Sequence, residues 1–456
     1  KEAQPDAGLP TNNYCNRRKQ LEQEASLRSF GRYAAPGILG QVGISCYILA
    51  DTFFVSRGTG ATGLAALNIA LPLYNLMNGI GLMIGVGSAT HFTICRAQGQ
   101  QKEADRAFTH AAGLGLMAGL FFLLLGVLAA GPLARLLGAD AETFPLTSVY
   151  LRTLLCFGPF FIMNNVLLAF VRNDGGPSRA MCGMIIGSLS NVVMDYVFIF
   201  PLGMGMFGAA LATGVSPIIS MLILSGHLRS PARGFHLLRT RLHLHLLPAL
   251  CTPGLPSLIS ELSSGVVLLL FNQVLLRLAG NTGVAAYGIV ANLALVAVAV
   301  FTGLSTGVQP LVSHSSGTGE SASLRRLFRY GIVTAIAIAT VLFTVVFVFA
   351  GPIAAVFNSA GDPVLAGYAV TGLRIYFLGF WCAGLNIVCA AFFSASGRSG
   401  QGFAISLLRG VIFIPPVLLA LTAFADVNGV WATFPTVEAL VAVLTLVCLS
   451  RTFRRS

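Results

Sequence analysis

The sequence predicts an all-α integral membrane protein whose twelve transmembrane helices form two six-helix lobes, related by a parallel pseudo-two-fold repeat. Composition is the first indication, because 55% of the 456 residues are hydrophobic and only 10% are charged, whereas soluble domains carry about 25% charged residues. Uncharged stretches are the second: no charged residue lies between Arg106 and Arg135, or between Arg329 and Asp362. Each stretch can cross a bilayer core of about 30 Å as a helix. The strict alternation of a transmembrane barrel strand is absent, which leaves helices as the spanning structure.

An internal repeat is the third indication. The segment TGLAA at 62–66 recurs 220 positions later as TGVAA at 282–286. The same offset relates Gly87 to Gly307, Gly99 to Gly319, Phe108 to Phe328, and Gly131-Pro132 to Gly351-Pro352. Because six is even, both lobes have the same orientation in the membrane. Two such lobes enclose a central cavity, which favours a transporter with alternating access over a channel, since no segment resembles a selectivity filter.

The net charge of +12 could suggest nucleic-acid binding, but the distribution of the basic residues argues against it. With the amino end inside, most of the 28 Lys and Arg fall on one face of the membrane or at helix ends on that face. The exceptions are Arg57, Arg135, Arg152, Arg277 and Arg374. The positive-inside rule therefore predicts a multi-pass protein of the inner or plasma membrane with both termini in the cytoplasm.

The first lobe is expected at 29–228, after a polar cytoplasmic tail at 1–28 that lacks the apolar region of a signal peptide. Its first span, about 34–55, contains Pro36, Gln41 and Asp51, and the proline predicts a bend or weak point. The later spans are expected at about 64–88, 107–130 and 146–170, followed by a hairpin of two spans that ends near residue 228.

A basic cytoplasmic linker at 229–248 separates this lobe from the second lobe at 249–450, and a basic cytoplasmic tail follows at 451–456. His243 and His245 in the linker are two residues apart and cannot share a helix face, so interfacial solvation is expected rather than metal binding. The nine cysteines include no CxxC pair and no His/Cys ligand spacing, and they are expected to be small core residues.

Asn191 and Asp195 give the strongest functional signal, because they lie four residues apart on one face of an otherwise apolar helix. An acid at the bilayer centre costs roughly 2.5–3.5 kcal/mol and usually faces a cavity, a partner or an ion. Counting about 1.5 Å per residue places Asp51 at the same depth and Thr213 in the same outer half. Two carboxylates, an amide oxygen and a hydroxyl predict a cation site for Na⁺ or H⁺, between which the sequence does not choose. The alternative is a carboxylate satisfied by a neighbouring helix for packing alone.

The second lobe carries different acids. Glu261 is the only acid of span seven and is either a cavity residue or a helix-end acid in contact with water. Glu438 stands alone in the last span and is expected to be structural. Asn165 belongs to a group of amides in apolar spans that either line a cavity or bridge helices, and we expect Gln41, Asn165 and Glu261 to line the substrate cavity.

These stretches together resemble the multidrug and toxic compound extrusion (MATE) family, particularly its bacterial branch with DinF-like and staphylococcal multidrug-efflux members. The resemblance covers roughly residues 28–450. It is carried by LADTFFVS with Asp51, GLAALNIALP from Gly63, NNVLLAFVRNDGGPSRAM from Asn164, and SNVVMDYVFIFPLGMGMFGAALAT from Ser190.

The resemblance implies two lobes of six helices that form a V, and drug or metabolite antiport against Na⁺ or H⁺. It implies that the cation site consists of Asp51, Asn191, Asp195 and Thr213. It also implies that Pro36 is the point at which the first helix bends. The span-ten acid of the NorM-like branch has no counterpart, since 372–391 contains only Arg374 as a charged residue. A cation site in the second lobe is therefore not expected.

The sequence and the resemblance together predict a secondary antiporter that exports amphipathic, cationic organic compounds in exchange for Na⁺ or H⁺, with no cofactor. Its expected partners are a small organic substrate and the lipid bilayer, without nucleic acid, and it is expected to function as a monomer. A lipid or lipid-linked saccharide flippase is the nearest alternative, but it should have a strongly basic cavity, and the intramembrane basic residues are few, chiefly Arg374 and Arg409. A membrane enzyme or receptor is a weaker alternative, since no Ser/His/Asp arrangement or extramembrane domain is visible.

Overall fold

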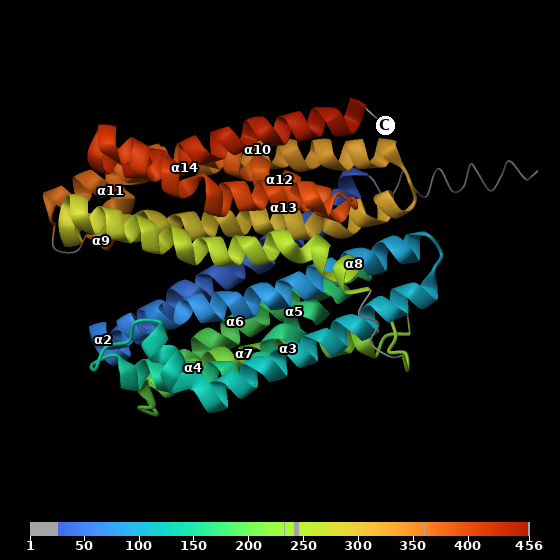
Figure 1. Ribbon diagram of the computed structural model, residues 1–456, viewed down its shortest axis with the longest axis horizontal. Coiled ribbons are helices and arrows are strands. Elements are labelled where there is room, and N and C mark those ends of the chain that lie inside the picture. Colours follow the sequence, from blue (N-terminus) through green and yellow to red (C-terminus); the bar gives the residue numbers. More distant parts are fainter. Residues whose placement is uncertain (1–25, 232, 241–245, 359–360, 455–456) are drawn as a thin grey trace, which may run out of the picture.

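The protein is a bundle of long antiparallel helices (Figure 1). The computed structural model describes residues 26–231, 233–240, 246–358 and 361–454; the side chains of residues 61 and 451–454 are not described. The first half contains α2 (Leu27–Ala97), α3 (Gln101–Leu136), α4 (Phe144–Cys156), α5 (Gly158–Asn173), α6 (Pro177–Ile199) and α7 (Gly205–Leu228). The second half contains α8 (Leu247–Cys251), η2 (Thr252–Gly254), α9 (Leu255–Gly317), α10 (Ser321–Phe357), α11 (Pro363–Tyr376), η3 (Phe377–Gly379), α12 (Phe380–Ala395), α13 (Ser399–Leu407), η4 (Leu408–Ile412) and α14 (Ile414–Arg454).

The twelve predicted spans can be followed along these helices. Among the described residues, nine helices are long and apolar enough to cross a membrane, and the bent pair α4 and α5, with an angle of 49°, makes a tenth span. Two of the nine hold two crossings each, because the chain reverses at Gly280 within Leu247–Gly317 and at Asp426 within Ser399–Ser450. The spans are longer than the apolar stretches that predicted them, since the helices continue into the polar region at both ends.

The predicted repeat is visible in the turns. Gly60 and Gly280, 220 positions apart, have φ of 72° and 62°, and Gly99 and Gly319 have φ of 77° and 74°. Only glycine adopts this left-handed region without strain, so the repeated glycines mark where the chain reverses in each half. The turns that join α2 to α3, α5 to α6, α9 to α10 and α12 to α13 contain Gly99, Gly175, Gly319 and Gly397. These turns lie at one end of the bundle, which we call the basic end, and we call the opposite end the distal end (Figure 1).

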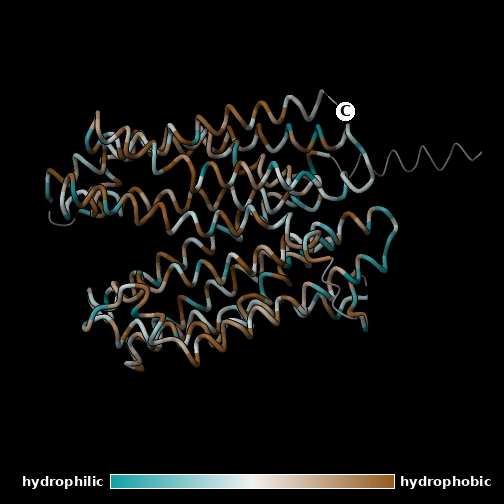
Figure 2. Tube along the Cα trace, viewed as in Figure 1, coloured by the Kyte–Doolittle hydropathy of each residue, from teal (hydrophilic) through white to brown (hydrophobic). Residues whose placement is uncertain are grey.

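Each half has its own apolar core. One core runs from Val55 to Leu250 and the other is built mainly from residues of Phe271 to Val441. Apolar residues follow the helix shafts and polar residues gather at the ends of the bundle (Figure 2). Phe30 and Ala34 at the start of α2 pack in the second core, so the first helix leans across to the other half at the basic end. The lobe limits 29–228 and 249–450 stay predictions, and the tail at 1–25 lies outside the described residues.

The two halves meet closely at the basic end. A Cβ on Gly37 would collide with the carbonyl oxygen of Gly303. Likewise, a Cβ on Gly303 would lie 2.5 Å from the carbonyl oxygen of Gly37. Gln309 Nε2 donates across the same junction to Thr90 Oγ1 at 2.5 Å and to the carbonyl oxygen of Val86 at 3.2 Å. Such close backbone approach is available only to glycine, so these positions keep the basic end shut.

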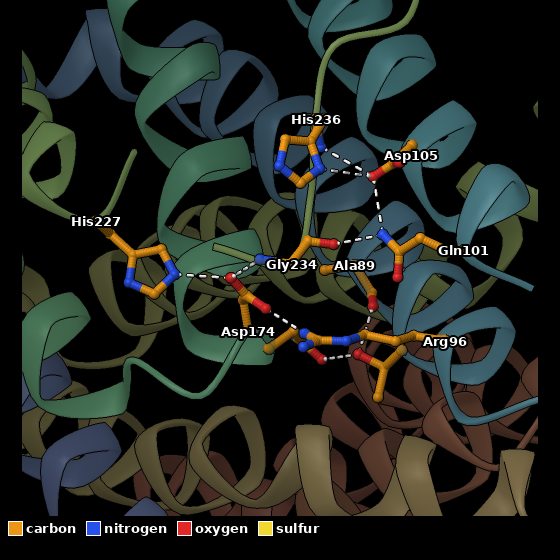
Figure 3. Close-up of polar contacts among 10 residues, drawn as sticks. Ala89, Arg96, Gln101, Asp105, Asp174, His227, Gly234 and His236 are labelled. Atoms are coloured by element: carbon orange, nitrogen blue, oxygen red, sulfur yellow. Dashed lines mark hydrogen bonds and ion pairs between the residues drawn. The ribbon is translucent and has the colours of Figure 1, made fainter. Parts of the chain in front are cut away.

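The start of the predicted linker is fixed to the first half rather than loose (Figure 3). The Asp174 carboxylate, which has no exposed surface, forms an ion pair with Arg96, and its Oδ2 accepts from Gly234 N at 2.8 Å. His227 Nε2 lies 2.8 Å from the same Oδ2. A Cβ on Gly234 would strike both Arg96 and Asp174, which explains the glycine there.

Phe235 continues this attachment. It is fully buried and packs on Phe108 and Phe170 with ring centroids 4.5 and 5.6 Å apart. Asp105 Oδ1 then accepts from His236 N at 2.9 Å (Figure 3). Residues 233–238 therefore belong structurally to the first half, whereas His243 and His245 lie outside the described residues.

Candidate functional site

Four of the predicted site residues meet inside the first half. The helix α2 has two arms, Leu27–Gly60 and Thr62–Ala97. Asp51 lies on the first arm of α2, Asn191 and Asp195 lie on α6, and Thr213 lies on α7. Their exposed fractions are 8% or less, and Asn191 and Asp195 have none. Asn191 and Asp195 share one face of α6 because they are four residues apart. The depth of Asp51 along α2 likewise follows from the number of helical residues before it.

Asn191 links Asp195 and Thr213 within this cluster. With its amide oriented so that both polar atoms are satisfied, Nδ2 donates to Asp195 Oδ2 at 3.0 Å and Oδ1 accepts from Thr213 N at 3.2 Å. The amide thus fixes the Asp195 carboxylate and ties α6 to α7 at the level of the acids. A hydrogen bond within an apolar helix pair is costly to leave unmade, so this contact also sets the register of the hairpin.

The carboxyl groups of Asp51 and Asp195 lie close enough to act on each other electrostatically. Two like charges buried together repel, so a cation or a proton bound between them would be favourable. Asp51 Oδ1 and Asp195 Oδ1 are buried and have no hydrogen-bond partner among the described residues. A buried acceptor without a donor is destabilising.

Tyrosines complete the surroundings of this cluster, and the sequence reasoning missed them. Tyr150 on α4 is 4% exposed, and its hydroxyl lies next to the Thr213 side chain. Tyr47 and Tyr74, on the two arms of α2, have hydroxyl oxygens 3.2 Å apart. These tyrosines could have been found from the sequence, because each places a polar hydroxyl in an otherwise apolar span. A polar group in an apolar span is also what identified the acids.

A second polar group joins the two halves. Asn165 Nδ2 on α5 donates to Asn78 Oδ1 on α2 at 2.9 Å. Asn78 in turn lies next to the side chain of Glu261 on α9, which is half-buried. The predicted cavity residues Asn165 and Glu261 are therefore connected through Asn78, a residue that sequence reasoning did not single out. Their separation in sequence explains why no local pattern could pair them.

The comparison with known families decides what this arrangement belongs to. A family model described as MatE matches residues 36–197 and 256–419, most of both halves. The chain belongs to the MatE family. The resemblance predicted from LADTFFVS and the Asn191–Asp195 segment is thereby confirmed.

Curated relatives of this MatE chain are export proteins. Multidrug export protein MepA of Staphylococcus saprophyticus is 25% identical over 430 residues, covering 93% of this chain and 94% of the relative. Multidrug export protein MepA of Staphylococcus aureus strain MRSA252 is 24% identical over 427 residues, covering 93% of each chain. The protein is a multi-pass membrane transporter and not an enzyme.

Solved structures agree with the predicted all-α, two-lobed fold. An outward-facing conformation of a multidrug resistance MATE family transporter of the MOP superfamily superimposes with a TM-score of 0.86 at 24% identity, covering 92% of this chain and 94% of that chain. A crystal structure of MATE in the straight conformation has a TM-score of 0.84 at 24% identity, with the same coverage. These likenesses confirm the fold class.

Two further predicted positions lie on the first arm of α2 in this MatE chain. The arm passes through Pro36 with helical backbone angles, and the only non-helical residue within α2 is Gly60. The bend at Pro36 therefore stays a prediction. Gln41 is half-buried, and its carbonyl oxygen accepts from Ser45 Oγ at 3.2 Å. Its place in a substrate cavity also stays a prediction.

The second half of the MatE chain has a different polar centre. Arg409 Nη2 donates to Glu438 Oε1 at 2.5 Å, and Asn386 Nδ2 donates to Glu438 Oε2 at 2.8 Å. Arg409 lies in η4, a single π-helical turn of Leu408–Ile412. Glu438, which is predicted to be structural, is thus paired with Arg409, one of the two intramembrane basic residues that the sequence indicates.

Proposed function

We propose that the protein is a secondary antiporter that exports amphipathic, cationic organic compounds in exchange for a cation bound by Asp51 and Asp195. The buried pair of carboxyl groups with two unpartnered oxygens is the observation that supports this proposal most directly. Asn191 and Thr213 would orient the pair, and Glu261 with Asn78 and Asn165 would receive the positive group of the substrate at the junction of the lobes.

A proton on one of the two neighbouring acids would remove the repulsion between their charges without further ligands, and we therefore take H⁺ as the bound ion. Na⁺ would instead need both carboxylates ionised and turned toward it, together with the Asn191 and Thr213 oxygens. One charge moving through 150 mV provides about 3.5 kcal/mol, which supports an accumulation ratio of roughly a few hundred. We infer that ion binding neutralises the acids, bends the first arm of α2 at Pro36 and lowers affinity for the exported compound.

We further propose that the basic end faces the cytoplasm, that both termini lie there, and that one chain is the functional unit, because it already contains both lobes. A tag on either terminus should then be cleaved by protease in inside-out membrane vesicles and protected in right-side-out vesicles. The reverse pattern would contradict the orientation.

The deciding experiment is transport of ethidium in proteoliposomes, with a pH gradient and a Na⁺ gradient imposed separately. We expect dye movement under the pH gradient, and its loss in the Asp51→Asn and Asp195→Asn variants, which keep side-chain volume but cannot share an acidic proton. Glu142→Gln is the matched control, since Glu142 is an acid of the distal turn that accepts from Thr62 Oγ1 at 2.8 Å and lies outside the cluster.

Dye movement driven by the Na⁺ gradient alone would mean that the coupling ion is Na⁺ rather than H⁺, while the assignment of the site would stand. Full transport in both Asn variants would remove Asp51 and Asp195 from the mechanism. Movement of a short-chain fluorescent lipid with no movement of dye would favour the flippase alternative.

A further inference from the structure

The space between α10 and the end of α14 is a groove at the basic end of the second half. Its volume is about 300 Å³, and it is lined by Arg325, Phe328, Arg329, Ile332, Val333 and Leu449. The first turns of α10 and the last turns of α14 lie side by side there (Figure 1). We propose that this groove binds an anionic glycerophospholipid of the leaflet at the basic end, with its phosphate held by Arg325 and Arg329.

The two arginines are placed to act on one phosphate. They are four residues apart, so they lie on the same face of α10, and both are exposed. A guanidinium offers a planar fork of donors that matches phosphate oxygens, and two forks one helix turn apart can hold one phosphodiester from two sides. A basic groove between transmembrane helices is a known form of lipid headgroup site.

The depth of the groove fits a headgroup. Arg329 is the last charged residue before the uncharged stretch 330–361, so its guanidinium marks the boundary between the headgroup region and the hydrocarbon. Ile332 and Val333 follow directly on the hydrocarbon side, and Val333 is 58% exposed. Ile336, one turn further along α10, is 46% exposed and continues the apolar wall. This is the path that an acyl chain attached to the phosphate would take.

Charge selects among lipids at this site. The described lining of the groove contains two cations, Arg325 and Arg329, and no acid. Glu320, the acid at the start of α10, does not line the groove, and its carboxylate accepts a hydrogen bond from Ser323 Oγ at 2.8 Å. A zwitterionic lipid would bring its own ammonium into this basic surrounding, whereas phosphatidylglycerol brings net negative charge. A soluble phosphate would leave the apolar wall uncovered, which is why we assign the groove to a lipid.

The experiment compares phosphatidylglycerol and phosphatidylcholine of identical acyl chains, added to the purified full chain in detergent. Native mass spectrometry should show one phosphatidylglycerol retained more strongly than the others, and thermal unfolding should shift upward more with this lipid than with phosphatidylcholine. Arg329→Gln should weaken the retained binding at least about tenfold, the size expected for losing a charged hydrogen-bond donor.

Arg326→Gln is the matched control, because Arg326 is an exposed arginine of the same helix that does not line the groove. It removes the same charge and should leave the retained lipid in place. Equal losses in the two variants would show diffuse attraction to the basic end and overturn the site. So would equal retention of both lipids by the wild-type chain, or equal stabilisation by glycerol phosphate without acyl chains.

Discussion

At the scale of single residues, the Tyr150 hydroxyl contacts the Thr213 side chain next to the acid pair. Tyr150→Phe keeps the ring in the core and removes only the hydroxyl that lies next to Thr213. A typical net hydrogen bond contributes about 0.5–1.5 kcal/mol, so we expect the cation to bind roughly twofold to tenfold more weakly while the thermal stability changes little. The measurement is the dependence of ethidium transport on the size of the ion gradient.

Tyr287→Phe is the control for this change, because Tyr287 is a buried tyrosine of the second half that packs on Phe271. An unchanged ion dependence in Tyr150→Phe, or an equal change in Tyr287→Phe, would place Tyr150 outside the site.

Residue-scale prediction from the sequence worked where the signal was local. Asn191 and Asp195 share a helix face because of the 3.6-residue period, and their contact follows from that period alone. Asn78 and Glu261 come from different halves and meet only when the lobes dock, so no spacing in the sequence could pair them. The ion pair between Arg409 and Glu438 could not be predicted for the same reason, since 29 residues and a chain reversal separate them.

At the scale of elements, the distal turn between α3 and α4 is organised by Asp140. Its Oδ1 accepts from Thr143 N and Thr143 Oγ1, both at 2.8 Å. These hydrogen bonds to the ionised form hold the pKa of the Asp140 carboxyl below its ordinary value. A lowered pKa in the folded state means that the turn is stabilised above the ordinary aspartate pKa of about 3.9, and that this stabilisation is lost as the pH falls further.

We therefore expect amide protons of residues 140–144 to exchange faster, relative to an unfolded peptide, as the pH is lowered through and below 4. Asp140→Asn should remove this pH dependence, because an amide does not titrate there. The same acceleration in the Asn variant would contradict the role of Asp140.

The π-helical turn η4 is the element that presents Arg409 to Glu438. Glu438→Gln leaves the guanidinium, 14% exposed, without its counter-charge, and breaking a buried pair in this way typically costs about 3–5 kcal/mol. The double variant Arg409→Met with Glu438→Met removes both charges and should recover most of that stability. Thermal unfolding in detergent distinguishes the two, and a double variant as unstable as the single one would contradict the argument.

The spans themselves were predictable because apolar length is a strong signal. Their ends were not, since helices such as Gln101–Leu136 extend well past the hydrocarbon-sized stretch on both sides. The docking of residues 233–238 on the first half was also missed. That segment has the composition of a solvated basic linker, and only Phe235 indicates burial.

At the scale of the whole molecule, the repeat predicted two lobes of one plan, but not the end at which they touch. If access alternates, the same sequence must be compatible with two conformations, one open at each end. The sequence therefore does not predict which of the two conformations is observed. In the structure the two lobes approach each other closely at the basic end, where Gly37 meets Gly303. The structure is therefore the state closed at that end.

This closure can be weakened with a single methyl group. Gly303→Ala places a Cβ about 2.5 Å from the Gly37 carbonyl oxygen, closer than real Cβ contacts, so the lobes must separate there. We expect the population to shift toward the state open at the basic end, and paired spin labels across that junction should report a longer mean distance. Gly288→Ala on the same helix is the control, because a Cβ there meets no atom within 4 Å. Since a substitution shifts the equilibrium only by its different effect on the two states, an unchanged distance distribution in Gly303→Ala would mean that the glycine contact does not hold the basic end closed.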